Sequence, residues 1–181
     1  MSSAFITNIA FPKSLEEVSF FVNEVGHYDV EEILAETNIE WTAPKDAYNG
    51  ELVFFMHSKT SIDTIRRLKR QLQSSQPDLS PDFYDALAEA LDRGEKLYER
   101  IGGCIFAKGV VDGDIIVDEY ARKSGLHWSS IYYAPISGIE VFDNPVHISQ
   151  FRDFIFISRT GAITKLNDEQ TEKLLELVEK P

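Results

Sequence analysis

A cluster of polar side chains directly follows an apolar run in the first third of the chain. Residues 52–56 read Leu-Val-Phe-Phe-Met, and residues 57–60 read His-Ser-Lys-Thr. An imidazole, two hydroxyls and an ammonium can bind an anionic or carbonyl group, or transfer a proton. A phosphate loop here would need glycine directly before Lys59 and six residues before it, where Ser58 and Val53 stand. The pattern therefore predicts a ligand pocket at a strand end and argues against a nucleoside-triphosphate loop.

Two tryptophans are the aromatic residues best suited to line such a pocket. Trp128 lies between His127 and Ser129, a polar setting that is poor for a central core strand, and Trp41 precedes the apolar run. An aromatic face stacks a nucleobase with a contribution of about 1–3 kcal/mol. Arg159, flanked by hydroxyls, could add a guanidinium near an anionic or carbonyl ligand. Ordinary core packing is the alternative role for each aromatic residue. We predict as ligand-binding residues Trp41, His57, Ser58, Lys59, Trp128, Ser129, Tyr132 and Arg159.

The charge of the chain is acidic overall but locally basic. The formal net charge of −12 argues against a generic polyanion binder, because phosphate contacts need lysine and arginine. Residues 59–70 nevertheless hold five basic residues against one acidic residue. This segment can present a local anion-binding face, or it can be the solvated face of a helix. We predict as phosphate-contacting residues Arg66, Arg67, Lys69 and Arg70.

The remaining reactive residue types indicate no metal or cofactor. The histidines at positions 27, 57, 127 and 147 lack metal-ligand spacing. Cys104 is the single cysteine, so an internal disulfide is excluded and a buried, inert thiol is expected. No apolar run approaches the roughly 20 residues that span a bilayer, and the first residues lack the pattern of a signal peptide. We therefore expect a cytoplasmic protein without metal, cofactor or membrane association.

Local signals predict helices at both ends and in the middle of the chain. Capping-box patterns open helices at 14–17, 29–32 and 167–170. Ser61 is predicted to cap one central helix, and Ser80 followed by proline opens another that ends at Gly102.

Apolar and β-branched runs predict strands between these helices. The expected strands are 52–56, 104–111 with a hairpin arm at 115–118, a bent strand at 131–141, and short strands or extended segments at 146–148 and 154–157. Together the elements predict an α+β fold: a mainly antiparallel β-barrel with flanking terminal helices and a helical insertion at 61–101. We expect a single domain over 1–181, with N-terminal helices within 1–39.

Three of these segments together resemble the PUA-like superfamily, most closely its EVE branch. Domains of that branch pair a Gly-Asp-x-hydrophobic-aromatic-aromatic strand with an Ile-x-Gly-x-Val strand. Here residues 50–58 read Gly-Glu-Leu-Val-Phe-Phe-Met-His-Ser, with Glu51 in place of the aspartate, and residues 105–111 form a looser second element. Trp128 and the tyrosines at 132 and 133 follow, and the last residues, from 146 onward, are similar to the closing part of such domains. The resemblance covers 40–181 apart from 61–101 and implies a PUA-like β-barrel.

The resemblance also implies a function. EVE-type domains bind RNA or modified DNA bases through an aromatic pocket, which Trp41, His57, Ser58 and Trp128 would line here. A first alternative is a nucleoside or RNA hydrolase of the related ASCH type, with Lys59 or Lys108 and a carboxylate in acid–base roles. A second alternative is a protein-interaction module that uses 61–101. We expect binding of a nucleic acid or a nucleobase-like small molecule rather than catalysis, and assign no catalytic residue.

Overall fold

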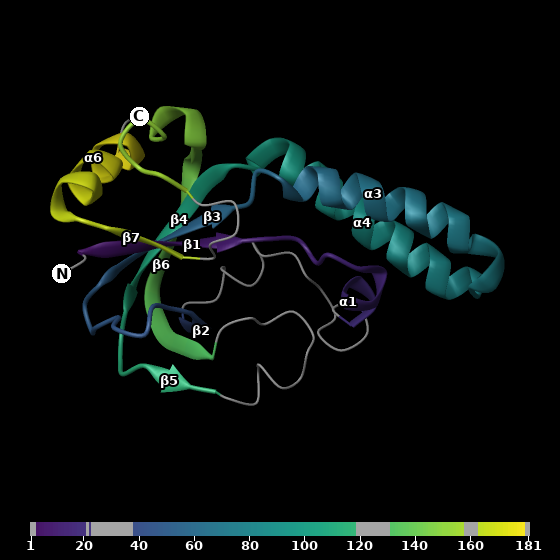
Figure 1. Ribbon diagram of the computed structural model, residues 1–181, viewed down its shortest axis with the longest axis horizontal. Helices are drawn as coiled ribbons and strands as arrows, with labels where there is room; N and C mark the ends of the chain where they lie inside the picture. The colour runs from purple at the N-terminus through teal and green to yellow at the C-terminus, as the bar shows by residue number, and fades with distance from the viewer. Residues whose placement is uncertain (1–2, 21, 23–37, 119–130, 158–162, 180–181) are drawn as a thin grey trace.

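Seven strands form one curled sheet in the computed structural model, which describes residues 3–20, 22, 38–118, 131–157 and 163–179 (Figure 1). Their order across the sheet is β2-β6-β4-β3-β1-β7, and β5 also pairs with β6. Only β1 and β3 are parallel among these pairs. The strands are β1 (Ala4–Ile9), β2 (Asn38–Thr42), β3 (Leu52–His57), β4 (Cys104–Val111), β5 (Ile116–Val117), β6 (Tyr132–His147) and β7 (Ile163–Leu166). The predicted α+β class with a mainly antiparallel sheet is confirmed.

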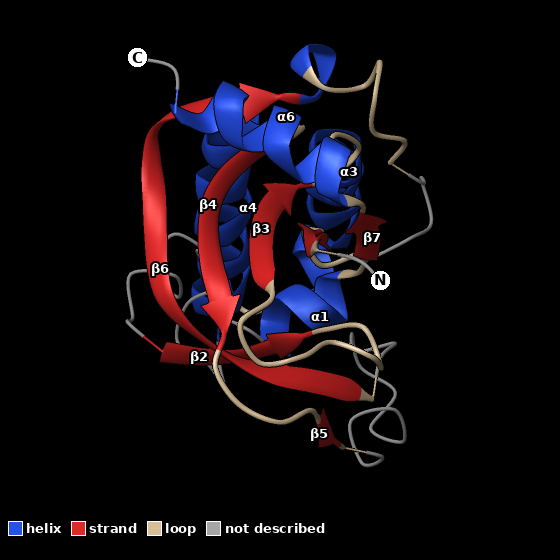
Figure 2. Ribbon diagram, turned by 90° about the vertical axis from the view of Figure 1, so that its left-hand side faces the viewer, coloured by secondary structure: helices blue, strands red, loops and turns tan. Residues whose placement is uncertain are grey.

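The sheet curls into a half-barrel, as Figure 2 shows for β6, β4 and β3. Trp41 on edge strand β2 donates a hydrogen bond from Nε1 to Oγ1 of Thr7 on β1, at 3.2 Å, although three strands separate β2 from β1 in the sheet. The long β6 makes this possible, because its pairing with β4 shifts register twice and the strand bends there. The bent strand predicted from 131 onward is therefore confirmed.

The alternation of side chains divides the sheet into two apolar faces. The concave face holds Phe5, Val53, Phe55 and Phe106, and the opposite face holds Phe54 and its neighbours on β1 and β4. Helix α6 (Asp168–Glu179) packs on that opposite face through Leu174.

The start of α6 confirms its predicted capping box. Asn167 N–H donates to Oε1 of Gln170 at 3.0 Å, and Gln170 N–H donates to Oδ1 of Asn167 at 2.8 Å. These reciprocal bonds satisfy donors that the first turn of a helix would otherwise leave unpaired.

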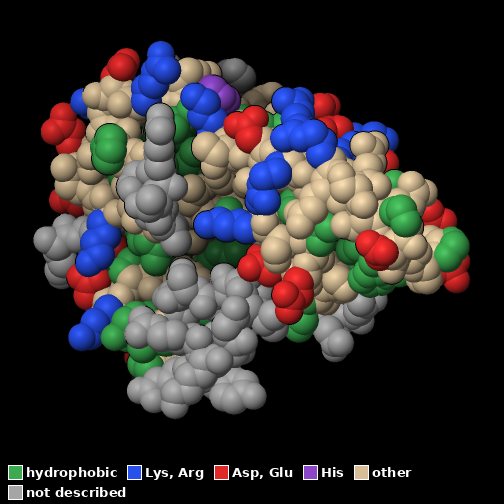
Figure 3. Space-filling model, turned by 45° about the vertical axis from the view of Figure 1, so that its right-hand side comes forward, with side chains coloured by type: hydrophobic (Ala, Val, Ile, Leu, Met, Phe, Trp, Pro, Cys, Tyr) green, Lys and Arg blue, Asp and Glu red, His purple; other side chains and the backbone are tan. Residues whose placement is uncertain are grey.

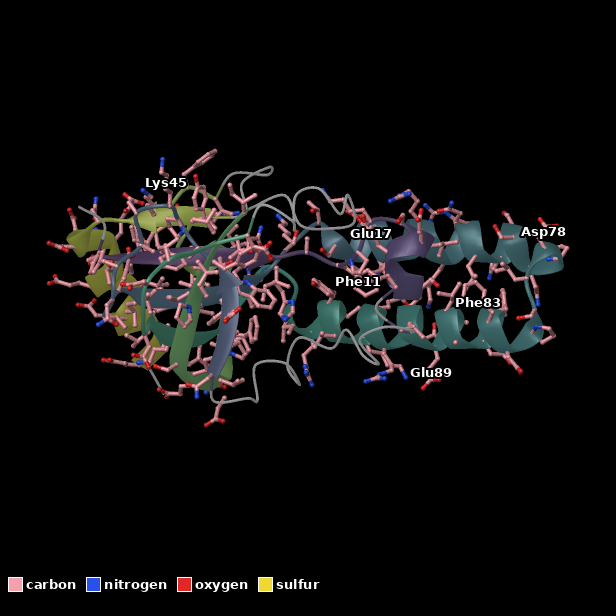
Figure 4. All side chains as sticks on the ribbon, turned by 90° about the horizontal axis from the view of Figure 1, so that it is seen from below. Phe11, Glu17, Lys45, Asp78, Phe83 and Glu89 are labelled. Carbon is pink, nitrogen blue, oxygen red and sulfur yellow. The ribbon has the colours of Figure 1, made fainter. Side chains whose placement is uncertain are left out.

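The segment between β3 and β4 is a helical hairpin that extends away from the sheet (Figures 1 and 4). It consists of α3 (Ser61–Ser75), a short 3-10 turn (Gln76–Asp78) and α4 (Pro81–Ile101). Ser80 caps α4 as predicted, because its Oγ accepts from Phe83 N–H at 3.3 Å. Apolar stripes on the two helices, including Leu68 and Leu91, form a separate core between them.

Phe11 joins the sheet to this hairpin. After β1 the chain passes Phe11 and enters α1 (Leu15–Phe20), which begins with the predicted bond from Glu17 N–H to Ser14 Oγ, at 3.1 Å. The Phe11 ring, 3% exposed, packs against Gly94 of α4, where an added Cβ would lie 2.5 Å from a ring carbon. Glycine at position 94 therefore permits the close approach, and Figure 4 shows Phe11 beside the hairpin.

Three local predictions are wrong. Ser61 does not cap α3; the N-cap is Thr60, and Ser61 Oγ accepts from Phe11 N–H at 3.0 Å. The arm predicted at 115–118 does not pair with β4, since β5 pairs with β6. Residues 154–157 form turns and irregular backbone, not a strand, because Phe154 and Ile155 N–H donate back to Phe151 O.

The structure also contains strands that were not predicted, and one predicted helix lies outside the described residues. Strands β1, β2 and β7 are additions that the sequence patterns did not predict. The helix predicted to open at 29–32 falls outside the residues that the structure describes. No helix among the described residues is long and apolar enough to cross a membrane.

Candidate ligand-binding site

Trp41 lies on the concave face of the sheet with its indole in a fixed orientation. The bond from Nε1 to Thr7 holds one edge of the ring, and Phe55 contacts it edge to face with ring centroids 6.3 Å apart. Thr7 is almost fully buried, at 1% exposure, whereas Trp41 is only half-buried. The ring is thus anchored from inside the half-barrel while part of its surface faces solvent.

Tyr132 lies on the same face, close to Trp41. Trp41 pairs with Ala134 across the β2–β6 ladder, and Tyr132 stands two residues before Ala134 on β6. Diagonal neighbours of this kind share a face of the sheet and are about 7–8 Å apart at their Cα atoms. Both aromatic side chains are half-buried. The structure therefore brings together two of the predicted ligand-binding residues.

His57 is enclosed and does not line an open pocket. Its side chain is 0% exposed, stacked on Phe106 with centroids 4.3 Å apart and contacted edge to face by Tyr98 at 4.9 Å. Within the part of the chain that the structure describes, neither ring nitrogen has a hydrogen-bond partner. Burial lowers the pKa of His57 from 6.5 to about 3, so the imidazole is neutral at physiological pH. A direct ligand contact would need the rings around it to move.

The aromatic contacts form two groups that meet on the concave face. Trp41 contacts Phe55 on β3, and His57 follows Phe55 by two residues on the same face of that strand. His57 in turn contacts Tyr98, which contacts Phe11 edge to face with centroids 6.1 Å apart. The concave face is thereby packed continuously against the base of the helical hairpin.

The residues after His57 turn from buried to exposed. Ser58 is 8% exposed, and its Oγ accepts from Thr60 N–H at 3.3 Å. Lys59 is exposed. The predicted polar cluster therefore divides: His57 and Ser58 belong to the interior, and Lys59 belongs to the surface where the sheet meets the hairpin.

Two of the predicted phosphate-contacting side chains have carboxylate partners within the hairpin. Arg66 lies 3.6 Å from carboxylate oxygens of both Glu95 and Glu99. Lys69 lies 2.6 Å from Asp92 Oδ1 and 3.0 Å from Glu95 Oε1, and these hydrogen bonds raise its pKa. These ion pairs between the two helices favour the alternative stated above, the solvated face of a helix.

The other two basic residues of that helix differ in their partners. Arg67 Nη2 donates to the Lys13 carbonyl at 2.9 Å, and Arg70 is exposed. Figure 3 shows lysine and arginine side chains gathered along the face where the hairpin meets the sheet.

Several predicted residues lie elsewhere or outside the description. Trp128, Ser129 and Arg159 fall outside the described residues. Lys108 lies 3.9 Å from Glu140 Oε2. It pairs with Phe54 in the ladder between β3 and β4, and it therefore lies on the face away from Trp41.

Burial raises the pKa of the Cys104 thiol, which keeps the thiol protonated. In the described ranges, no group of three or more histidine, cysteine or acidic side chains could hold a metal ion.

Sequence reasoning missed Thr7 and His147. Thr7 is a polar residue within an apolar strand, a signal that could have indicated a buried hydrogen bond. His147 ends β6 beside Gly103, and only the pairing of β4 with β6 reveals this proximity.

An open groove lies at the seam of the half-barrel, with a volume of about 740 Å³. The Nζ of Lys165 on β7 lies 2.5 Å from Asp46 Oδ1, which links the loop after β2 to the far edge of the sheet and lowers the pKa of Asp46. Lys45, which belongs to this groove, is remote from the hairpin tip at Asp78 (Figure 4). The groove lining includes no aromatic residue among those described: Pro44, Lys45, Asp46, Ile163 and Lys165.

Comparison with known proteins gives structural neighbours only. No family model and no curated protein matches the chain. The chain is similar to the crystal structure of ASCH from Zymomonas mobilis, with a TM-score of 0.46 and 9% identity over 98% of this chain and 97% of that chain. A mutant of the same protein gives a TM-score of 0.46 and 7% identity over 98% and 99%. The N-terminal domain of Staphylothermus marinus McrB gives 0.32 and 12% identity over 97% and 94%.

With TM-scores below 0.5, these likenesses carry no argument about the family or the function of this chain. The functions proposed below rest on the contacts of this chain and not on the likeness.

Proposed function

We propose that this chain binds a nucleobase, as part of RNA, DNA or a nucleotide, on the concave face of its sheet. The observation that carries the proposal is the half-buried Trp41 ring, held by Thr7 and Phe55 beside Tyr132. An indole whose N–H is already bonded inside the protein offers its face and not its polar edge to a ligand. Base stacking needs such a fixed aromatic face.

The energetics favour an unpaired or readily unpaired base. Flipping a base out of a duplex costs a few kcal/mol, and stacking one base on an aromatic ring contributes only about 1–3 kcal/mol to binding. Trp128, Ser129 and Arg159 remain in the proposal as further contacts predicted from sequence. His57 has a different role from the predicted one: it packs behind Phe106 and supports the face without touching the base.

The affinity for a nucleic acid should depend only weakly on salt concentration for this kind of binding. Net charge is −12, and Arg66 and Lys69 already have carboxylate partners. Each phosphate contact that a protein makes steepens the loss of affinity with salt. A site that works mainly by stacking loses little affinity when salt rises from low to physiological concentration.

The test is a titration of single-stranded oligonucleotides, with and without a methylated base, at two salt concentrations. Wild type should bind, and Trp41→Ala should weaken binding by roughly 5- to 150-fold, which corresponds to about 1–3 kcal/mol. Trp41→Phe keeps an aromatic face but loses the indole N–H and should lie between the two. Equal affinities for wild type and Trp41→Ala, or no binding at low salt, would contradict the proposal.

A second candidate is hydrolysis of a nucleoside or RNA, which the proximity of Lys108 to Glu140 favours. An ammonium and a carboxylate at this distance can share acid–base work. A panel of modified nucleosides and a short RNA would be incubated with wild type and Lys108→Gln. Turnover by wild type that Lys108→Gln lacks would support hydrolysis, and absence of turnover across the panel would remove this candidate.

A third candidate follows from the hairpin, whose far end extends away from the sheet (Figure 1). The segment 61–101 could bind a protein partner through its outer faces. Deleting it, with a short turn in its place, should abolish recovery of a partner while the sheet stays folded; retained recovery would locate any partner elsewhere.

A further inference from the structure

Three strand ends meet at Gly103, where the sheet joins the hairpin. Gly103 N–H donates to the carbonyl of His57 at the end of β3, at 2.8 Å, and Gly103 O accepts from Ile148 N–H after β6, at 2.8 Å. A Cβ at this position would lie 3.4 Å from His147 Nε2 and 3.4 Å from Lys59 Cβ. The imidazole of His147 and the stem of Lys59 therefore both approach the space that a side chain at position 103 would occupy.

The His147 ring has a defined hydrogen-bonding role. Ser149 N–H donates to His147 Nδ1 at 3.1 Å, so Nδ1 is an acceptor. A neutral imidazole has one donor and one acceptor nitrogen, which places the proton on Nε2. His147 thus presents an N–H donor on the side of Gly103 where Lys59 runs.

Capping alone does not require histidine at position 147. Its side chain caps a short 3-10 turn, Ile148–Gln150. Asparagine, aspartate or serine performs such a cap with a shorter side chain. Histidine adds a second ring nitrogen, Nε2, which lies on the side of the ring away from the capping bond.

Lys59 and its surroundings supply positive charge. Lys59 is exposed and has no carboxylate at ion-pair distance in the part of the chain that the structure describes, in contrast to Arg66 and Lys69. Helix α3 begins directly after it, and the N-cap Thr60 makes no side-chain capping bond. The positive end of the helix dipole adds to the ammonium.

We propose that Lys59 and His147 form a phosphate-binding site at this junction. An ammonium and an imidazole N–H can donate charge-assisted or neutral hydrogen bonds to two oxygens of one phosphate. The phosphate is either a free anion or part of a nucleic-acid backbone. The site lies beyond the strand ends, apart from Trp41, and it does not depend on the base-binding proposal.

The test follows the Gly103 amide signal and the His147 ring nitrogens by NMR while inorganic phosphate is added. A second titration uses a single-stranded abasic oligonucleotide, which presents backbone phosphates without bases. Wild type should show saturable shifts at the Gly103 amide and at His147 Nε2. Loss of one charge-assisted bond in Lys59→Gln should weaken binding about tenfold.

His147→Asn separates binding from capping. Asparagine can still accept from Ser149 N–H, but it has no donor at the place of Nε2, so the fold should persist while phosphate affinity drops. Lys45→Gln is the matched control, because Lys45 is exposed and belongs to the groove on the sheet, away from the helical hairpin (Figure 4). It should leave the phosphate affinity unchanged.

The two titrations assign the source of the phosphate. A response to the abasic strand identifies backbone phosphates, and a response to inorganic phosphate alone identifies a free anion. The proposal is overturned if neither titration saturates, or if Lys59→Gln and His147→Asn bind like wild type. Trp41→Ala should keep the phosphate response, so failure of base binding and failure of this site are separate results.

Discussion

The concave face around Trp41 and the junction around His57 bury polar aromatic rings in opposite ways. The Trp41 N–H has an acceptor in Thr7, and part of the ring is exposed. The His57 ring is 0% exposed, and neither nitrogen is paired within the described ranges. An unpaired buried polar group lowers stability by about 1–3 kcal/mol, whereas a paired one is held in place. The first region thus holds an aromatic ring in place while leaving part of it exposed, and the second is a packed support in which the imidazole stays neutral at physiological pH.

The largest expected effect comes from removing the ring that anchors the junction. Phe11→Ala should lower the free energy of unfolding by about 3–5 kcal/mol, because a buried ring that contacts Tyr98 and Gly94 is replaced by a cavity. Urea unfolding measures this change. Phe156→Ala is the control: Phe156 is 83% exposed, so its loss should change stability by less than about 0.5 kcal/mol. Similar effects of the two variants would mean that Phe11 does not join the two cores.

The next effect is a pH dependence that arises at His57. Its folded-state pKa of about 3 lies below the unfolded value of 6.5, so the unfolded chain binds a proton that the folded chain does not. Stability from this group is fully present above pH 6.5 and is lost as pH falls toward 3, at up to about 1.4 kcal/mol per pH unit.

The comparison for this effect is His57→Phe, which keeps an aromatic ring between Phe106 and Tyr98. The variant should be at least as stable as wild type at pH 7.5 and should lose less stability between pH 6.5 and pH 4. Urea unfolding at several pH values measures both. Parallel pH profiles for wild type and variant would show that His57 is not the neutral, buried group described above.

The smallest effect tests the anchoring of Trp41. Thr7→Val keeps the shape of the side chain but removes the acceptor of the indole N–H, at a cost of about 1 kcal/mol in unfolding free energy. Oligonucleotide affinity should also fall, because the ring is no longer held at one angle. Unchanged stability together with unchanged affinity would mean that the bond from Trp41 to Thr7 does not organise the face.

Local signals predicted the elements that local chemistry determines. The apolar run of β3, the proline and serine at the start of α4, and the box at Asn167 each specify an element from neighbouring residues. Strand β1 was not predicted because Thr7 and Asn8 interrupt its short apolar run. Its partner strand, β3, also lies over forty residues away in the sequence. Its parallel pairing has no local signal.

The site was predictable only in part, for the same reason. Trp41 and Tyr132 could be chosen by residue type, but their proximity depends on the pairing of β2 with β6. The burial of His57 depends on Tyr98, which reaches it from α4. Long-range packing of this kind decides whether a polar residue at a strand end meets solvent or core, and a single sequence does not record it.

The indole N–H signal of Trp41 tests the base-binding proposal most directly. The chain has two tryptophans, so a ¹H–¹⁵N spectrum has two indole signals, and Trp41→Phe assigns the one that disappears. Adding a single-stranded oligonucleotide should shift the Trp41 signal saturably, with the abasic strand of equal length causing no such shift. An unchanged Trp41 signal at oligonucleotide concentrations that saturate binding would place the base elsewhere and contradict the account.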